Sequence, residues 1–272
     1  MTDAIPMAGV IGWPVEHSKS PIIHRHWLAD LGLKGDYVHL PVSPDSFEER
    51  IGELPAKGFV GANVTIPHKE AALSVADIVS DRAQAIGAAN TLVFRDGQVH
   101  ADNTDAEGFL NNLLSGAPEW SADQGPALVL GAGGAARAIV YALKNAGAPE
   151  VYIANRTETR AEKLADEFGL KVEPWGDIND ATKGAHTIVN TTSLGMTGQS
   201  ALELELHCKT SALVTDIVYS PLETPLLSQA KSKGMMTVDG LGMLLHQAVP
   251  GFEAWFGVRP DVTQALRDKV LA

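Results

Sequence analysis

Cysteine, net positive charge and long apolar runs are all scarce in this chain of 272 residues. The single cysteine, Cys208, cannot form an intrachain disulfide and has no metal-ligand company, which favours a reducing compartment. A formal net charge of −12 argues against a nucleic-acid or anionic-membrane surface, although a local basic pair can still hold a small anion. No apolar run is long enough to cross a bilayer, and residues 1–12 lack the pattern of a signal peptide. We therefore expect a cytoplasmic protein with neither nucleic acid nor membrane as a partner.

Strand-like and helix-like segments alternate along the chain, which is typical of an α/β protein with mostly parallel sheets. The expected order is a strand at 8–12, a helix at 21–31, a strand at 37–41, a helix at 44–54 and a strand at 58–64. Strands at 91–95 and 98–101 then flank Asp96-Gly97, a two-residue turn signal that predicts a hairpin at the sheet's edge. The first domain is expected to end near residue 105.

A helix at 106–114 and a turn-rich stretch at 115–126 lead into a second alternating region. Its strands are expected at 127–130, 150–154, 185–190, 212–217 and 235–238. Apolar residues then recur at helical spacing from Leu241 to Phe252, where Pro250 is expected to kink or end the helix. Because a domain usually takes about 100 to 200 residues, the length predicts two open, mostly parallel α/β domains.

A glycine-rich turn joins the apolar strand at 127–130 to the helix that follows it. Gly131 allows a tight turn, Gly133 lets backbone N–H groups approach a phosphate, and Ala136 is small where helix meets strand. The helix would direct its positive end at the anion. Such a turn can also be purely structural, but the strand at 150–154 follows about 20 residues later, as a dinucleotide-binding Rossmann unit requires. The second domain is therefore predicted to bind a dinucleotide.

The residues after that second strand bear on which dinucleotide is bound. An acidic residue there would bind the ribose hydroxyl of NAD, whereas this chain has Asn155-Arg156-Thr157, with Arg160 one helical turn further on. Guanidinium groups pair with phosphate through planar, charge-assisted hydrogen bonds. The pattern favours NADP, although Arg160 by itself also fits a solvated helix residue.

Several polar residues in the first domain fit both a structural role and a functional role. Ser20 before Pro21 is a good N-cap, yet Ser18 and Ser20 at a helix N-terminus also suit a carboxylate. Lys69 is expected in the first turn of a helix started by Pro67, where the helix dipole disfavours an ammonium group. Such a violation often marks a functional site, but a lysine can also reach out to solvent. 

Asp105 and the histidines complete the polar groups that we considered. Asp105 could be an N-cap, or it could orient a lysine and a substrate hydroxyl. His17, His24 and His26 could suggest a metal, but His24 and His26 are two apart on a helix and do not share a face. No cysteine or acidic cluster completes a site, so no metal site is expected.

Taken together, seven short motifs resemble the shikimate dehydrogenase family, and the resemblance covers nearly the whole chain. The motifs are HSKSP at 17–21, NVTIPHK at 63–69, IGAANT at 86–91, DNTD at 102–105, GAGGA at 131–135, NRT at 155–157 and DG with a later Gln at 239–247. The resemblance implies NADPH-dependent, reversible reduction of 3-dehydroshikimate to shikimate, a step toward chorismate and the aromatic amino acids. It also implies a substrate-binding catalytic domain at 1–105, joined by the C-terminal helices of about 241–272, a Rossmann domain at 106–240, and an active-site cleft between them.

The resemblance assigns roles to individual residues. Lys69 would be the acid/base, assisted by Asp105. Substrate-binding residues would be Ser18, Ser20, Thr65, Asn90, Asp105, Tyr219 and Gln247. Cofactor-binding residues would be Asp81, Gly131, Ala132, Gly133, Gly134, Ala135, Asn155, Arg156, Thr157, Arg160, Thr191, Thr192, Ile217, Gly240 and Met243. For Asp81 we find no independent physical reason.

Other functions stay open at this point. The nearest is a quinate or dual quinate/shikimate dehydrogenase, possibly using NAD, against which Arg156 speaks. A non-catalytic NADP-binding regulatory module is the alternative from another class, and the presence of Lys69 and Asp105 counts against it. A tetrahydrofolate dehydrogenase shares the two-domain plan, but the motifs fit it less well. The partner is expected to be a small-molecule substrate, and the chain a monomer or a homodimer.

Overall fold

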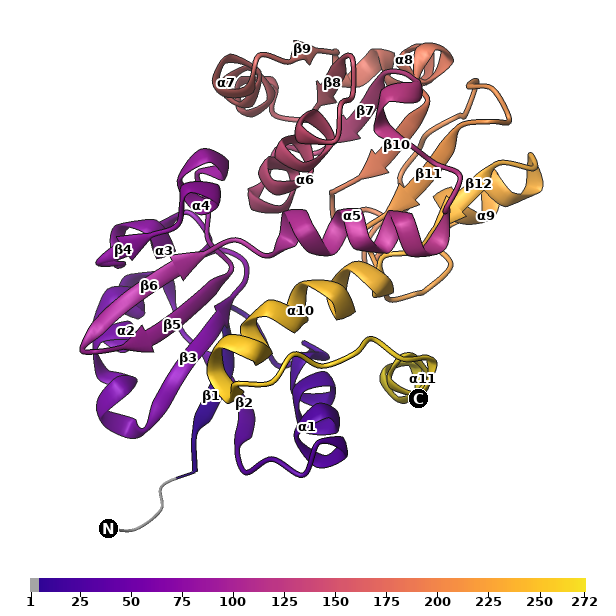
Figure 1. Ribbon diagram of the computed structural model, residues 1–272. Coiled ribbons are helices and arrows are strands. Elements are labelled where there is room, and N and C mark those ends of the chain that lie inside the picture. The colour runs from indigo at the N-terminus through magenta and orange to yellow at the C-terminus, as the bar shows by residue number, and fades with distance from the viewer. Residues whose placement is uncertain (1–4) are drawn as a thin grey trace. The chain divides into compact units, whose positions relative to one another are not determined.

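The computed structural model describes residues 5–272 and forms two compact units (Figure 1). Unit 1 comprises the chain up to Asp105 together with Leu244–Ala272, and unit 2 comprises Ala106–Met243. Each unit is built on a six-stranded sheet that is mostly or wholly parallel. The α/β fold class predicted from the sequence is confirmed.

The sheet of unit 1 has the strand order β2-β1-β3-β5-β6-β4. The strands are β1 Met7–Gly12, β2 Asp36–Pro41, β3 Phe59–Val64, β4 Ile78–Val79, β5 Thr91–Arg95 and β6 Gln98–Asp102. The first three are parallel, whereas β5 runs antiparallel to both β3 and β6. Asp96 and Gly97 both have positive φ, 53° and 75°, as the tightest two-residue hairpin turn demands. The hairpin is confirmed, but the edge strand is β4, which is too short to leave a periodic signal.

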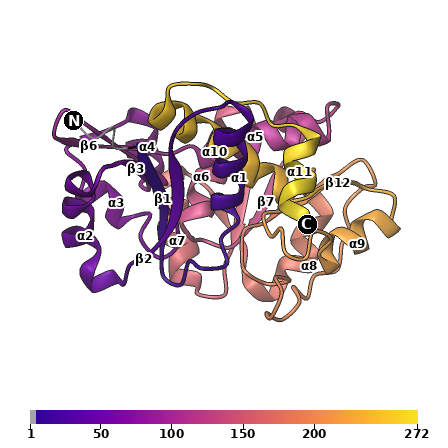
Figure 2. The ribbon, with the colours of Figure 1, turned by 90° about the horizontal axis from the view of Figure 1, so that it is seen from below.

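Helices cover both faces of this sheet. They are α1 Ser20–Asp30, α2 Phe47–Glu53, preceded by a 3₁₀ turn at Pro44–Ser46, α3 Ala71–Ser74, α4 Asp81–Ile86 and α11 Gln264–Leu271. Figure 2 shows α2 and α3 on one side of β1, with α1 on the other. The α2 face buries one apolar cluster, which includes Phe47, Ile51 and Leu92. On the opposite face, Tyr37 and Trp255 belong to a second cluster.

Two local predictions for unit 1 are wrong. Ser20 is not the N-cap of α1: Lys19 occupies that position without a side-chain cap, and Ser20 is already helical. No helix begins at Pro67, because the backbone there makes other hydrogen bonds. The His68 amide donates to Thr65 at 2.9 Å, and the Lys69 carbonyl accepts from Ala89 at 2.8 Å. The short helix α3 begins only afterwards.

Unit 2 has a fully parallel sheet in the order β12-β11-β10-β7-β8-β9. Its strands are β7 Ala127–Leu130, β8 Val151–Ala154, β9 Lys171–Val172, β10 Thr187–Asn190, β11 Leu213–Asp216 and β12 Met236–Val238. Its helices are α6 Gly134–Asn145, α7 Glu158–Phe168, α8 Ile178–Ala181 and α9 Pro225–Ser232. Ile178 of α8 and Leu226 of α9 pack in one cluster with Leu128 and Ile188 of the sheet. The Rossmann-like arrangement is confirmed, and only the two-residue β9 was not predicted.

Two helices cross the division between the units along the chain. Helix α5, Asp105–Gly116, begins at Asp105, which belongs to unit 1, and its other residues belong to unit 2. Helix α10, Leu241–Phe256, continues past Pro250, so the prediction that proline could end it is wrong. Proline removes one backbone donor, yet the helix is held by buried residues on either side of it, Ala248 and Phe252.

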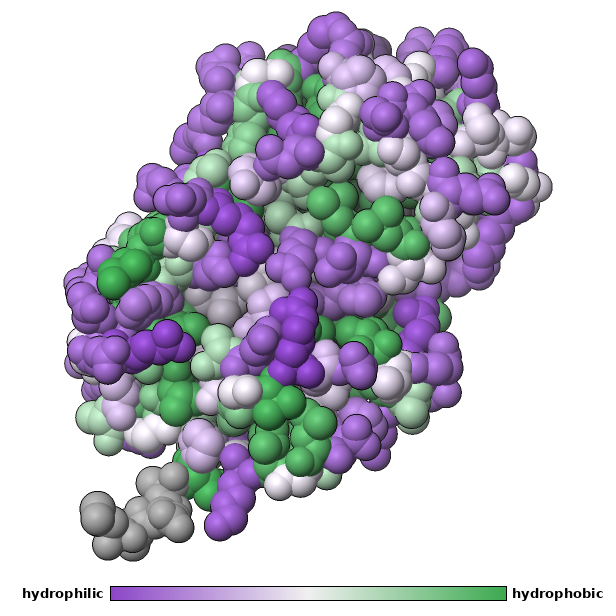
Figure 3. Space-filling view, in the orientation of Figure 1, coloured by the Kyte–Doolittle hydropathy of each residue, from purple (hydrophilic) through white to green (hydrophobic). Residues whose placement is uncertain are grey.

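The surface of each unit is mixed in character. Figure 3 shows hydrophilic residues over much of the visible face of both units, with hydrophobic residues in smaller areas between them. No helix of the described chain is long and apolar enough to span a membrane.

Candidate functional site

A buried ion pair lies at the centre of the polar network in unit 1. Lys69 follows β3, and its Nζ donates to Asp105 Oδ2 at 2.5 Å. The two side chains are only 14% and 6% exposed. Burying a lysine and a carboxylate is costly unless each is paired. A pair held in this way can hold and move a proton.

The carboxylate of Asp105 is not needed to cap its helix. Asp105 is the first residue of α5, and its backbone N–H donates to Asn103 Oδ1 at 3.0 Å. Asn103 in turn donates to the Ala88 carbonyl at 2.9 Å. Because Asn103 satisfies the helix end, the Asp105 carboxylate is turned toward Lys69 and Asn90. The N-cap interpretation of Asp105 is therefore wrong.

Asn90 joins this pair to the part of α10 that belongs to the same unit. Its Nδ2 lies 2.9 Å from Asp105 Oδ1, 3.0 Å from Thr104 Oγ1 and 3.1 Å from Gln247 Oε1. Its Oδ1 accepts from the Thr104 backbone N–H at 2.8 Å and from the Thr91 hydroxyl at 3.0 Å, and both contacts help to orient the carboxamide. The structure thus brings together four predicted site residues, Lys69, Asn90, Asp105 and Gln247.

The serine pair lies after the carboxyl end of β1. Ser18 Oγ donates to Ser20 Oγ at 3.2 Å, and the Ser20 backbone N–H donates to Ser18 Oγ at 3.3 Å. Lys19 occupies the N-cap position of α1 without a side-chain cap, and Ser18 Oγ accepts the backbone N–H of the first helical residue, Ser20. Thr65 stands at the end of the neighbouring strand β3, and its backbone N–H donates to Ile11 of β1 at 2.8 Å. All three hydroxyls therefore lie on the side of the sheet where the carboxyl ends of β1 and β3 meet.

In unit 2 the glycine turn is built as a dinucleotide site requires. Gly131 has φ of +107°, and a Cβ there would lie 2.5 Å from Thr191 Oγ1. Gly133 is the N-cap of α6, and a Cβ there would meet nothing within 4 Å. The chain at the start of α6 is therefore open to an approaching ligand, and Gly133 is exposed. A helix N-terminus with this geometry fits a pyrophosphate.

The remaining predicted cofactor residues of unit 2 follow neighbouring parallel strands. Asn155 follows β8, and its Nδ2 donates to the Thr157 carbonyl at 2.8 Å. Arg156 and Arg160 are exposed beside it, as a phosphate clamp requires. Thr191 and Thr192 follow β10, Ile217 follows β11, and Gly240 follows β12. Because carboxyl ends of parallel strands meet at one edge, these residues share that edge with the glycine turn.

A buried aspartate braces this edge, and the sequence reasoning missed it. Asp216 Oδ1 accepts from Asn190 Nδ2 and from the Val218 backbone, both at 3.0 Å, and Oδ2 accepts from Thr224 at 2.8 Å. Burial raises the pKa of Asp216, while these donors oppose the rise. Asn190 also accepts from the Thr192 hydroxyl at 2.8 Å. The sequence signal that could have identified Asp216 is a polar residue at the end of an apolar strand.

The last three predicted residues are Asp81, Tyr219 and Met243. Asp81 is exposed at the first position of α4 in unit 1, whereas the other predicted cofactor residues lie in unit 2. Tyr219 is half-buried after β11, and Met243 is buried in the part of α10 that belongs to unit 2.

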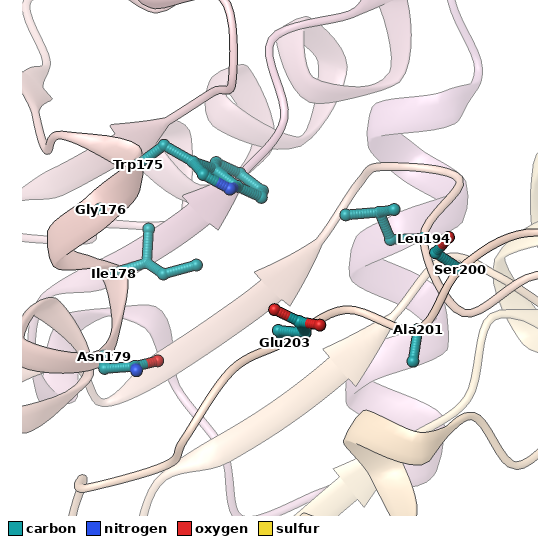
Figure 4. Close-up of a pocket in the computed structure, with 8 residues that line it drawn as sticks. All are labelled: Trp175, Gly176, Ile178, Asn179, Leu194, Ser200, Ala201 and Glu203. Carbon is teal, nitrogen blue, oxygen red and sulfur yellow. The ribbon is translucent and has the colours of Figure 1, made fainter.

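Unit 2 also has a pocket of about 340 Å³ that contains none of the predicted residues. Figure 4 shows Trp175 and Leu194 extending toward this space, with Glu203 below them. Its lining residues are Trp175, Gly176, Ile178, Asn179, Leu194, Ser200, Ala201 and Glu203. Among the described residues there is no cluster of three or more His, Cys, Asp or Glu side chains that could hold a metal ion.

The fold and the glycine turn define an α/β protein of the dinucleotide-binding class. Three family models match in succession along the chain: the shikimate dehydrogenase substrate binding domain at 10–92, shikimate / quinate 5-dehydrogenase at 117–241, and the shikimate 5'-dehydrogenase C-terminal domain at 240–271. The chain belongs to the shikimate/quinate dehydrogenase family.

Individual relatives are similar over almost their whole length. The shikimate dehydrogenase (NADP(+)) of Paracoccus denitrificans is 57% identical over 271 residues, which is 98% of this chain and 96% of the relative. A shikimate 5-dehydrogenase of Thermus thermophilus, solved with NADP(H) and shikimate, has a TM-score of 0.88 and 40% identity, covering 98% and 99% of the two chains. A quinate dehydrogenase of Corynebacterium glutamicum, solved with NAD, has a TM-score of 0.90 and 31% identity, covering 98% and 99%.

Proposed function

We propose that this chain catalyses the NADPH-dependent, reversible reduction of 3-dehydroshikimate to shikimate, the step toward chorismate and the aromatic amino acids. The observation that carries the proposal is the buried Lys69–Asp105 pair, held by Asn90 in a member of this family. A carbonyl reduction needs a proton donor at the oxygen that becomes a hydroxyl. Lys69 has the chemistry and the position for that role.

The proton and the hydride come from different sources in this reaction. NADPH, when bound, supplies the hydride to the carbonyl carbon. In the reducing direction, Lys69 Nζ donates its proton to the oxygen as negative charge develops there. Asp105 holds the ammonium group in place through its 2.5 Å contact. In the oxidising direction the same nitrogen accepts the proton from the substrate hydroxyl.

Polar side chains of unit 1 support a substrate with a carboxylate and several hydroxyls. Ser18 and Ser20, whose hydroxyl oxygens lie 3.2 Å apart, would hold the carboxylate. Thr65, Asn90, Asp105 and Gln247 would bind hydroxyls or the carbonyl. From unit 2 we propose Tyr219 as a further substrate-binding residue, with the substrate in a cleft between the two domains.

Unit 2 would hold NADP through the edge of its sheet. Gly131 to Ala135 would hold the pyrophosphate, and Asn155 to Arg160 the adenosine 2′-phosphate. The ribose and nicotinamide end would lie against Thr191, Thr192, Ile217, Gly240 and Met243. The family pattern also puts Asp81 among the cofactor residues.

Quinate is the second candidate substrate, because a quinate dehydrogenase is among the structures with the highest similarity. That protein was solved with NAD, whereas exposed Arg156 and Arg160 here suit the extra phosphate of NADP. We therefore favour shikimate and NADP. We further propose a cytoplasmic enzyme that is a monomer or a homodimer, binds a small-molecule substrate, and has neither nucleic acid nor membrane as a partner.

Lys69→Ala tests the assigned proton donor. Wild-type protein should oxidise NADPH when 3-dehydroshikimate is added, followed by the loss of NADPH absorbance. The variant should lose about 10²- to 10⁴-fold in kcat, the usual contribution of general acid catalysis, with a much smaller change in KM. A Lys69→Ala variant with near-normal kcat would reject the role of Lys69. A wild-type protein that binds NADPH but never turns over would favour a non-catalytic regulatory module.

A further inference from the structure

The hydroxyl of Tyr37 is a buried group that the proposed mechanism does not use. Tyr37 lies on β2 and is fully buried. Its hydroxyl donates to Asn63 Oδ1 of β3 at 2.7 Å, across the intervening strand β1. In the strand register, Tyr37 pairs with Ala8 and Asn63 pairs with Val10, so all four residues point to the same face of the sheet. The Tyr37 side chain thus extends over Ala8 and Val10 to the side-chain amide of Asn63.

The direction of this hydrogen bond is determined by the backbone. Asn63 Nδ2 lies 3.2 Å from the carbonyl oxygen of Asn90, which can only accept. The amide oxygen of Asn63 must therefore face Tyr37, and Tyr37 must donate. Burial raises the pKa of the Tyr37 hydroxyl well above its usual value, although the side chain of Ser20 nearby opposes the rise. The hydroxyl keeps its proton over the whole working range of pH.

From Asn63 the chain of hydrogen bonds continues to the ion pair. Asn63 Nδ2 donates to Thr91 Oγ1 at 3.3 Å, and Thr91 Oγ1 donates to Asn90 Oδ1 at 3.0 Å. Asn90 Nδ2 then donates to Asp105 Oδ1 at 2.9 Å, and Asp105 holds Lys69. Every donor in this series points the same way, from Tyr37 toward the carboxylate.

The ring that carries the hydroxyl is held rigidly. His24 stacks on it with centroids 4.0 Å apart and an interplanar angle of 5°, and Trp255 packs beside it at 5.9 Å. Trp255 is itself anchored by its Nε1 donating to the Leu92 carbonyl at 2.9 Å. Because these contacts pack the ring in place, the position of the hydroxyl is set before any substrate binds.

We propose that Tyr37 is a positioning residue of the active site: through Asn63 and Thr91, its hydroxyl holds the Asn90 carboxamide in the orientation that serves Asp105. This inference rests on the proposed function, because it assigns Tyr37 to the same reaction. Without the hydroxyl, Asn63 Oδ1 loses its donor in a buried site. It cannot recover by turning over, since its oxygen would then face the Asn90 carbonyl. Asn63 must shift, and Thr91 and Asn90 shift with it.

A double-mutant cycle on kcat tests the chain of contacts. Tyr37→Phe removes only the hydroxyl and keeps the stacked ring, and Thr91→Val replaces the second hydroxyl by a methyl group of similar size. Each variant should lower kcat about tenfold, which corresponds to about 1.4 kcal/mol and is typical for one hydrogen bond. The KM for NADPH should stay unchanged. Because both act through Asn90, the double variant should be about as slow as the slower single variant.

Tyr152→Phe is the matched control. The Tyr152 hydroxyl bonds Glu150 at 2.8 Å in unit 2, away from the Lys69 network, so this variant should keep wild-type kcat. A Tyr37→Phe enzyme with a lower Tm but unchanged kcat would show a merely structural role and overturn the proposal. A double variant about a hundredfold slower than wild type would overturn the chain through Thr91. An inactive wild-type protein would instead refute the proposed function, so the two failures are distinguishable.

Discussion

Replacing His24 with phenylalanine should remove a specific acid sensitivity from the folding of unit 1. The His24 ring is fully buried between Tyr37, Trp27 and Phe252, and neither of its nitrogens has a hydrogen-bond partner in the structure. Burial lowers the pKa of His24 to about 3, and the nearby Asn63 side chain offsets this only in part. The folded chain therefore keeps this histidine neutral while the unfolded chain protonates it.

The size of the effect follows from proton linkage. Between the unfolded pKa of about 6.5 and the folded value of about 3, the unfolded state binds one proton more, so stability falls as pH falls. Each pH unit in this window costs about 1.4 kcal/mol. From pH 7.5 to pH 5.0, His24 alone should reduce the free energy of unfolding by about 2 kcal/mol. Phenylalanine keeps an aromatic ring against Tyr37 and cannot take up a proton.

The assay is urea unfolding at the two pH values, followed by the fluorescence of Trp27 and Trp255, which pack in the same aromatic cluster. The larger phenylalanine ring can cost stability by overpacking, but that cost is the same at both pH values. The expected result is that His24→Phe loses about 2 kcal/mol less than wild type on acidification. Replacing the exposed His17 with glutamine is the control for an ordinary histidine. Equal losses in wild type and His24→Phe would refute the reasoning.

Two further predictions concern a second ion pair and the cofactor. Burial raises the pKa of Asp102, but Arg82, Ser80 and the Asn103 backbone outweigh it and lower the pKa overall, so the carboxylate stabilises the fold above about pH 4 and loses this effect as pH falls. Asp102→Asn should lower the free energy of unfolding by about 1 kcal/mol at pH 7, after allowance for solvent screening. Between pH 5 and pH 3 the urea midpoint of the variant should fall less than that of wild type. An equal fall of the two midpoints would contradict this prediction. Arg156→Ala should raise the KM for NADPH about tenfold, as expected for loss of a charge-assisted contact. The KM for NADH should stay unchanged. Equal effects on both cofactors in steady-state assays would show that Arg156 does not bind the 2′-phosphate.

Local signals predicted much of the fold. Asp96-Gly97 predicted the hairpin because few residues other than glycine and aspartate or asparagine adopt positive φ in succession. Apolar strands followed by glycine or polar residues predicted the sheet of unit 2. Strands β4 and β9 have two residues each and leave no periodicity to read. The expected helix at Pro67 failed because the Lys69 carbonyl bonds Ala89, a contact that only the folded chain reveals.

The site was predicted unevenly for a related reason. Lys69 and Asp105 were identified because both lie in motifs of the family. Lys69 was also singled out because it was expected in the first turn of a helix, which the structure does not contain. Tyr37 carries no such mark, and Asn63 and Thr104 lie in motifs of the family that gave them no role of their own. Their importance comes from contacts between distant segments, such as Tyr37 with Asn63 and Thr104 with the Gln247 carbonyl at 2.7 Å. A buried polar side chain can be recognised as part of a network only when its partners are known.

The central claim is the identity of the substrate and cofactor, and the most direct measurement is a two-by-two comparison of kcat/KM. Purified protein would be assayed with 3-dehydroshikimate and with dehydroquinate, each with NADPH and with NADH. The account predicts the highest kcat/KM for 3-dehydroshikimate with NADPH, at least about tenfold above the other pairs, since a single lost hydrogen bond or ion contact is worth about that factor. A higher kcat/KM for dehydroquinate, or for NADH with either substrate, would contradict it.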